Sequence, residues 1–214
     1  YCFRYFDFIQ KERCSQRISL IKNEGFVYLC IMTTAAKTKP SLHTVLTSQL
    51  LDLYNVKDSI VVIIDVFRAT STMATALYNG ASKIIPVDTP ELCIEVGKQT
   101  GGVTAGESDG KIIPGLAYGN SPSEYPRDFI ENKILVITTT NGTKLLHLAL
   151  KQGAKDIITG SFPNFTKVVE YIKEQNAPVI LGCSGWKNRF SIEDVLFAGA
   201  VIEEIKDAYE IHCD

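Results

Sequence analysis

The stretch IVVIIDVFRATST, residues 60–72, decides the fold class of this 214-residue chain. Its five consecutive aliphatic residues, most of them β-branched, are typical of a parallel strand that is covered on both faces. Asp65 ends this run, and hydroxyl residues then stand at the expected start of a helix, which Asn79-Gly80 would end. A second strand over 83–87 and a second helix that begins near Pro90 follow. The stretch therefore predicts a β-α-β-α unit.

The same order of features recurs later in the chain. A strand, a polar loop and a helix are expected over 134–137, 138–143 and 144–150. Residues 153–158 match residues 80–85 without a gap, and this register aligns Asp65 with Thr138. We interpret the pattern as an internal duplication, although generic β-α-β patterning is an alternative. Alternating strands and helices predict a three-layer α/β/α fold with a mainly parallel sheet, built from two duplicated β-α-β-α units.

A third buried strand is expected over 178–182, directly before Cys183. Ser191, with Asp194 three residues on, has the form of a capping box ahead of an Ala-rich helix. Polar loops thus follow three buried strands. Because loops at the carboxyl ends of parallel strands line the ligand crevice of an open α/β sheet, we expect the functional site there.

Composition excludes several classes of protein. The 22 Lys and Arg residues against 24 Asp and Glu residues leave no basic surplus for a nucleic acid backbone. The apolar runs are far shorter than the roughly 20 residues that cross a bilayer. The six cysteines form no C-x-x-C pair, so we expect reduced thiols in a cytoplasmic protein. The oligomeric state stays open, with a homodimer as one alternative.

The N-terminal stretch differs from the rest. Residues 1–31 contain three of the six cysteines and show no sustained helix or strand periodicity, whereas a polar opening follows Met32. We therefore expect an atypical N-terminal extension over 1–31 and one domain over 32–214. The alternative is that 1–31 forms an ordinary extra element packed on the domain.

Asp65 is the sharpest candidate for chemistry. A carboxylate that directly follows five aliphatic residues emerges partly desolvated from the core and needs a cation beside it. Arg68 is one candidate, and Mg²⁺ is the other because it binds one or two protein carboxylates together with water and phosphate oxygens. Glu107 follows a short strand and is the second expected carboxylate. The alternatives are a structural Asp that caps its loop and an exposed loop Glu.

Two loops have the composition of anion sites at helix starts, where the helix dipole favours negative charge. Their candidate ligand-binding residues are Thr70, Ser71 and Thr72 in the first loop and Thr139, Thr140, Asn141, Gly142 and Thr143 in the second. Neither loop has the spacing of a nucleotide P-loop. Ordinary helix caps are the alternative.

Cys183 and Arg189 have the C-x5-R spacing of cysteine-dependent phosphatases, in which a thiolate attacks phosphorus and an arginine binds its oxygens. Trp186 and Lys187 stand where small residues would let backbone amides converge. A small buried cysteine at the end of a strand is therefore the alternative.

The ordered motifs together resemble the 2-phosphosulfolactate phosphatase family over residues 41–207. They are DVFRATST at 65–72, GE at 106–107, GNSP at 119–122, TTTNGT at 138–143 and RFSIED at 189–194. The resemblance implies a Mg²⁺-dependent hydrolase that converts 2-phospho-3-sulfolactate to 3-sulfolactate and phosphate, a step that feeds coenzyme M synthesis in methanogens. It adds Asn120 and Ser121 to the expected substrate-binding residues. The chain ends earlier than family members usually do, so we expect a C-terminal element to be missing.

This substrate carries three anionic groups, so it needs several anion-binding groups. Our mechanistic hypothesis assigns Mg²⁺ to Asp65, with Glu107 or Glu193 helping, and the phosphate oxygens to Arg68 and the Thr-rich loop. Arg189 and Asn141 would then hold the sulfonate or the carboxylate, and Cys183 is also counted among the expected substrate-binding residues. A cysteine-dependent phosphatase and a noncatalytic anion-binding protein remain alternatives.

Overall fold

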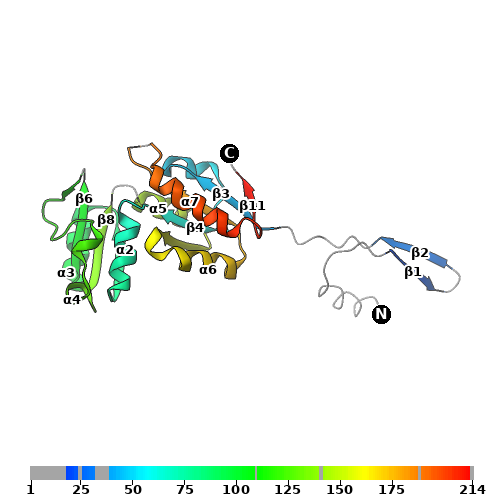
Figure 1. Ribbon diagram of the computed structural model, residues 1–214, viewed down its shortest axis with the longest axis horizontal. Coiled ribbons are helices and arrows are strands. Elements are labelled where there is room, and N and C mark those ends of the chain that lie inside the picture. The colour runs from blue at the N-terminus through cyan, green and yellow to red at the C-terminus, as the bar shows by residue number, and fades with distance from the viewer. Residues whose placement is uncertain are drawn as a thin grey trace. The chain divides into compact units, whose positions relative to one another are not determined.

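A computed structural model describes residues 18–23, 26–31, 39–108, 110–139, 142–187 and 189–212 (Figure 1). The chain divides into two compact units, Tyr1–Lys39 and Pro40–Asp214. In the first unit β1 (Ile18–Asn23) and β2 (Phe26–Ile31) form an antiparallel pair, which the sequence pattern had not indicated. Met32, the expected first residue of the domain, lies outside the described residues.

The second unit contains two sheets. The five-stranded sheet has the order β11 (Glu210–His212), β3 (Ser41–Val45), β10 (Val179–Cys183), β4 (Ile60–Ile64) and β9 (Asp156–Gly160), and all its neighbouring strands are parallel. The four-stranded sheet has the order β5 (Lys83–Val87), β8 (Ile134–Thr139), β6 (Val103–Ser108) and β7 (Lys111–Ile112), and only β6 and β7 pair antiparallel. The predicted α/β class with mainly parallel strands is confirmed.

The two repeated units exchange strands between these sheets. Helix α2 (Ala69–Tyr78) leads from β4 to β5, and α5 (Gly142–Lys151) leads from β8 to β9. Strand β4 pairs with β9 and β5 pairs with β8, so each unit contributes its first strand to one sheet and its second strand to the other. The element order repeats as predicted. The division into two sheets was not predicted, because burial patterns do not say which strands pair.

Helices cover both faces of each sheet. In β4, Ile60, Val62 and Ile64 pack toward α6 (Phe165–Gln175) and α7 (Ile192–Ile205), whereas Val61 and Ile63 pack toward α5 and η1 (Ser48–Leu53). All five β4 side chains are at most 4% exposed, and burial of each stabilises the fold by about 1.5–3 kcal/mol. This burial explains the unbroken aliphatic run.

The four-stranded sheet is covered by α3 (Pro90–Thr100) on one face and by α2 with α4 (Arg127–Ile130) on the other. The predicted start of α3 is confirmed, because Thr89 accepts a hydrogen bond from the Leu92 amide and Pro90 opens the helix. The remaining short helices are η2 (Pro122–Glu124) and η3 (Phe162–Asn164). Within the described ranges, none of the helices is both long and apolar enough to cross a membrane.

Candidate active site

One cleft of about 970 Å³ lies where strands of both sheets end. Strands β4 and β10 of the first sheet and β6 and β8 of the second contribute their carboxyl-terminal loops to it. Of the residues predicted from the sequence, Asp65, Arg68, Glu107, Asn120, Thr139 and Glu193 line this cleft. Charged lining residues that were not predicted are Lys144, Lys187 and Asp194.

Asp65 lies in the cleft at the end of β4. The backbone amides of Arg68 and Ala69 donate hydrogen bonds to its carboxylate, because the start of α2 folds back over it. Burial, and then repulsion by Asp194 and Glu193, nevertheless raise the pKa of Asp65 to about 7. A carboxylate in this environment is stabilised by a nearby cation, as the sequence pattern indicated.

Asp194 is the buried partner of this carboxylate and is only 2% exposed. Its Oδ1 accepts the Val66 amide hydrogen at 2.8 Å, and its Oδ2 accepts that of Gly185 at 3.2 Å. Burial raises the pKa of Asp194 to about 6, although these hydrogen bonds oppose the shift. The predicted capping box is therefore wrong: Ser191 makes no side-chain cap, and Asp194 joins the loops that follow β4 and β10.

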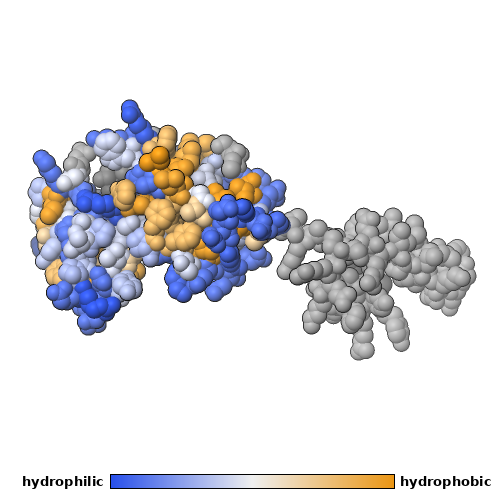
Figure 2. Space-filling model, in the orientation of Figure 1, coloured by the Kyte–Doolittle hydropathy of each residue, from blue (hydrophilic) through white to orange (hydrophobic). Residues whose placement is uncertain are grey.

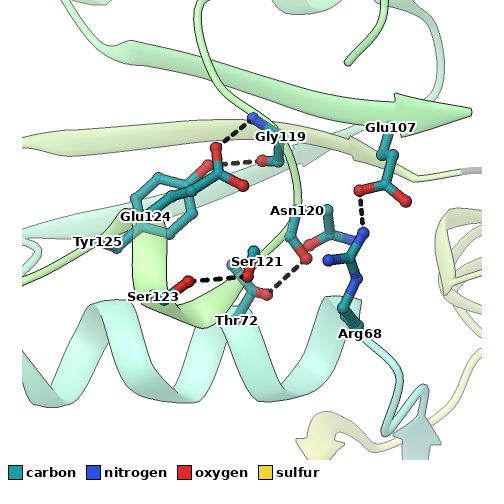
Figure 3. A network of polar contacts seen from close by, with 9 residues as sticks. All are labelled: Arg68, Thr72, Glu107, Gly119, Asn120, Ser121, Ser123, Glu124 and Tyr125. Atoms are coloured by element: carbon teal, nitrogen blue, oxygen red, sulfur yellow. Dashed lines mark hydrogen bonds and ion pairs between the residues drawn. The ribbon is translucent and has the colours of Figure 1, made fainter. Parts of the chain in front are cut away.

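Arg68 and Glu107 form an ion pair across the cleft, between Nη2 and Oε2 (Figure 3). Arg68 stands at the start of α2, directly after β4 of the five-stranded sheet, and Glu107 lies at the end of β6 of the four-stranded sheet, so the pair connects the two sheets. Both side chains are partly exposed. The pair fixes the direction of the guanidinium, which keeps further N–H donors for an anion.

Asn120 is held beside Arg68 by its neighbours (Figure 3). Thr72 Oγ1 donates to the Asn120 carbonyl at 3.1 Å, and the Tyr125 hydroxyl donates to the Gly119 carbonyl at 2.7 Å. The Asn120 side chain is buried, and its Oδ1 has no hydrogen-bond partner in the described structure. A buried polar atom without a partner is costly, so this oxygen points to a bound ligand or water.

Three other predicted hydroxyl residues hydrogen-bond to the backbone. The Thr70 hydroxyl lies 2.8 Å from the carbonyl oxygens of both Asp65 and Gly160, which share its proton, whereas Ser71 donates to the carbonyl of Val66 and Thr143 to that of Thr139. These side chains are buried and hold the loops in shape. Thr70, Gly142 and Thr143 also line a second, smaller cavity of about 220 Å³ with mostly apolar walls. Ser121 bonds to Ser123 and does not line the cleft.

An open position lies between Asp65 and Thr139. A β-carbon placed on Gly142, the first residue of α5, would lie 3.1 Å from Thr139 Oγ1 and 3.7 Å from Asp65 Oδ2. Thr139 is buried, and its Oγ1 has no hydrogen-bond partner within the described ranges. The missing side chain at 142 thus leaves the backbone at the start of α5 uncovered between a carboxylate and a hydroxyl, so that a ligand can approach it. Thr140 and Asn141 lie outside the described residues.

The structure separates Cys183 from Arg189. Cys183 is fully buried, and burial, followed by repulsion from Asp194, raises the pKa of its thiol to about 12. A protonated thiol is a poor nucleophile. Arg189 is exposed and does not line the cleft, and its backbone pairs with that of Trp186. This arrangement favours the interpretation of Cys183 as a buried strand residue.

Apolar side chains surround part of the opening. Phe67 and Trp186 line the cleft and are 74% and 58% exposed. Ile192 and Leu196, in the first turns of α7, are also exposed, and Figure 2 shows hydrophobic residues gathered over α7. The cleft therefore combines a polar floor with an apolar edge.

Several known proteins are similar to this chain in sequence. A family model described as 2-phosphosulpholactate phosphatase matches residues 45–214. The chain belongs to this family. A probable 2-phosphosulfolactate phosphatase of Thermotoga maritima is 46% identical over 145 residues, which cover 68% of this chain and 62% of that protein.

Two other family members match more of their own length. Proteins of the same name from Caldanaerobacter subterraneus subsp. tengcongensis and Clostridium perfringens are 37% identical over 163 residues and 35% identical over 169 residues. These matches cover 75% and 77% of this chain and 67% and 68% of the respective relatives. The chain spans about three fifths of the length of its Thermotoga relatives.

Proposed function

We propose that this chain carries the active site of a Mg²⁺-dependent phosphatase that hydrolyses 2-phospho-3-sulfolactate to 3-sulfolactate and phosphate. Family membership supports the reaction. The observation that carries the proposal is the position beside Gly142, which lies next to the Asp65 carboxylate and the unpartnered Thr139 hydroxyl at the ends of strands from both sheets. Because no β-carbon stands there, a phosphoryl group can approach the Gly142 backbone between these two side chains.

The charges of the cleft favour a divalent cation. Four carboxylates, Asp65, Glu107, Glu193 and Asp194, line it, against the three cations Arg68, Lys144 and Lys187. A substrate with a phosphate, a carboxylate and a sulfonate adds further negative charge. Without a bound cation the cleft would repel this substrate, so the charge balance supports Mg²⁺.

The donor atoms of the site fit Mg²⁺, which takes oxygen ligands and binds proteins through one or two carboxylates. The described residues contain no group of three or more His, Cys, Asp or Glu side chains that could hold a metal ion. Asp65, with Asp194 or Glu193, supplies the carboxylates, whereas Glu107 is engaged by Arg68. A bound Mg²⁺ would offset phosphoryl charge and lower the pKa of a bound water molecule.

The protein's own groups orient the substrate. The Arg68 guanidinium, held by Glu107, binds phosphoryl oxygens, because its planar set of N–H donors matches them. The start of α5 adds the positive end of a ten-residue helix beside Thr139 Oγ1. Asn120 Oδ1 accepts a hydrogen bond from a water molecule of the site. These groups are in place before the substrate binds, which lowers the cost of orienting it.

Two variants separate this mechanism from the cysteine-dependent alternative. Release of phosphate from 2-phospho-3-sulfolactate is measured for the wild type, Asp65→Asn and Cys183→Ser. The proposal expects the Asp65 variant to lose activity by at least about a hundredfold, and the Cys183 variant to keep it. Activity that disappears in Cys183→Ser and survives in Asp65→Asn would establish the cysteine mechanism. Binding of 3-sulfolactate by a wild type that releases no phosphate would indicate a binding protein.

Further expectations from the sequence stay proposals. The two described free cysteines, Cys93 and Cys183, are buried, which is consistent with the proposed cytoplasmic location. A homodimer is tested by light scattering of the purified protein. The proposed product, 3-sulfolactate, suits a pathway such as coenzyme M synthesis.

A further inference from the structure

The three cations of the cleft differ in their surroundings. Arg68 is paired with Glu107, and the Lys187 ammonium lies 4.5 Å from the centroid of the Trp186 ring. Lys144 lines the same cleft, is exposed and forms no ion pair or hydrogen bond with a described residue. Its charge is therefore available to an anionic ligand.

The position of Lys144 places this charge next to the phosphoryl site. Lys144 is the third residue of α5, two residues after Gly142, so both stand in the first turn of the helix. The uncovered backbone of Gly142 adjoins Thr139 Oγ1, which is buried and unpartnered in the described structure. This orphaned hydroxyl is an independent indication that a ligand occupies the start of α5. An anion held by Lys144 would thus be a close neighbour of a phosphoryl group held beside Asp65.

We propose that Lys144 is a specificity-determining residue that binds the sulfonate group of the substrate. This inference rests on the proposed function, because 2-phospho-3-sulfolactate carries its sulfonate on the carbon next to the one that bears the phosphate. A sulfonate carries a negative charge spread over three equivalent acceptor oxygens, any of which can accept a hydrogen bond from an ammonium group. A carboxylate is planar and is matched better by the planar donors of an arginine.

The test compares two substrates that differ only in the sulfonate, 2-phospho-3-sulfolactate and 2-phospholactate. Lys144→Met removes the charge and keeps the aliphatic stem. We expect it to lower kcat/KM for the sulfonated substrate by about 10- to 100-fold, mostly through KM, the effect of losing a hydrogen bond to a charged group. The value for 2-phospholactate should change by less than about threefold.

Two further variants serve as controls. Lys144→Arg keeps the charge and should restore most of the preference for the sulfonated substrate. Lys151→Met removes a lysine from the last turn of the same helix and should leave both substrates unaffected. Equal losses on both substrates in Lys144→Met, or no loss, would overturn the assignment of Lys144 to the sulfonate.

Calorimetric binding of 3-sulfolactate separates this inference from the proposed function. If Lys144→Met weakens this binding about tenfold or more while the wild type releases no phosphate, the sulfonate site stands and the phosphatase proposal fails. If the wild type hydrolyses 2-phospho-3-sulfolactate and Lys144→Met binds 3-sulfolactate as tightly as the wild type, the inference fails alone. If the wild type neither binds nor hydrolyses, both are overturned.

Discussion

Gly142→Ala should separate stability from activity in this protein. Gly142 opens α5, and its backbone lies outside the left-handed region, so alanine fits without strain. Alanine in place of glycine within a helix stabilises a protein by about 0.5–1 kcal/mol. The new methyl group would lie 3.1 Å from Thr139 Oγ1, a tight contact that offsets part of this gain. We therefore expect a change in unfolding free energy of within about 1 kcal/mol.

The same methyl group blocks the approach of a phosphoryl group to the backbone of residue 142 beside Asp65. Exclusion of this group should lower kcat/KM by at least about a hundredfold, which corresponds to roughly 2.7 kcal/mol of transition-state binding. Activity is measured by phosphate release from 2-phospho-3-sulfolactate, and stability by urea unfolding of the same preparation. The loss of activity should therefore appear in a protein that is as stable as the wild type.

Gly199→Ala is the matched control. Gly199 lies inside α7, and a β-carbon there would meet no atom within 4 Å. This variant should gain about 0.5–1 kcal/mol of stability and keep wild-type kcat/KM. Wild-type activity in Gly142→Ala would refute the placement of the phosphoryl group, and a large loss of stability would refute the assumption that alanine is tolerated.

Other perturbations have defined outcomes. Because the pKa of Asp65 is raised to about 7 and that of Asp194 to about 6, the folded metal-free protein holds more protons than the unfolded chain above about pH 4. Its stability, from urea unfolding in chelator, should therefore fall as pH rises from about 4 to 7, and a rise would contradict the raised pKa values of the two buried carboxyls. Asp194→Asn removes a charge that raises the pKa of Asp65. Urea unfolding of this variant should therefore show a smaller decrease in stability over the same pH range. An unchanged decrease would exclude the coupling between the two carboxyl groups. Glu107→Gln frees the Arg68 guanidinium and should lower kcat/KM roughly tenfold, and unchanged kinetics would remove Glu107 from the site.

Local sequence patterns sufficed for the parts of the site that depend on one strand and its loop. The aliphatic run 60–64 predicts β4, and its abrupt end predicts that Asp65 emerges at a sheet edge, as the structure shows. Glu107 was expected at a strand end for the same reason and lies there. The family motifs placed Asn120 in the expected site, and it lines the cleft.

Features that depend on tertiary pairing could not be predicted in this way. Asp194 looked like a helix-capping acid, whereas its hydrogen bonds reach Val66, 128 residues earlier in the chain. Lys144 was expected only as part of a helix over 144–150, because nothing local shows that the first turn of α5 faces the ends of strands from both sheets. The exchange of strands between the repeats creates this cleft, and a burial pattern carries no information on strand partners.

In the proposed mechanism, Asp65 and a divalent cation together promote hydrolysis of a phosphorylated sulfonate. The most direct measurement is phosphate release from 2-phospho-3-sulfolactate by chelator-treated protein to which Mg²⁺ is added back in steps. Activity should be lost on chelation, return with saturating dependence on Mg²⁺ in the wild type, and not return in Asp65→Asn. Full activity in the presence of chelator, or restoration of the Asp65 variant to the wild-type level, would contradict it.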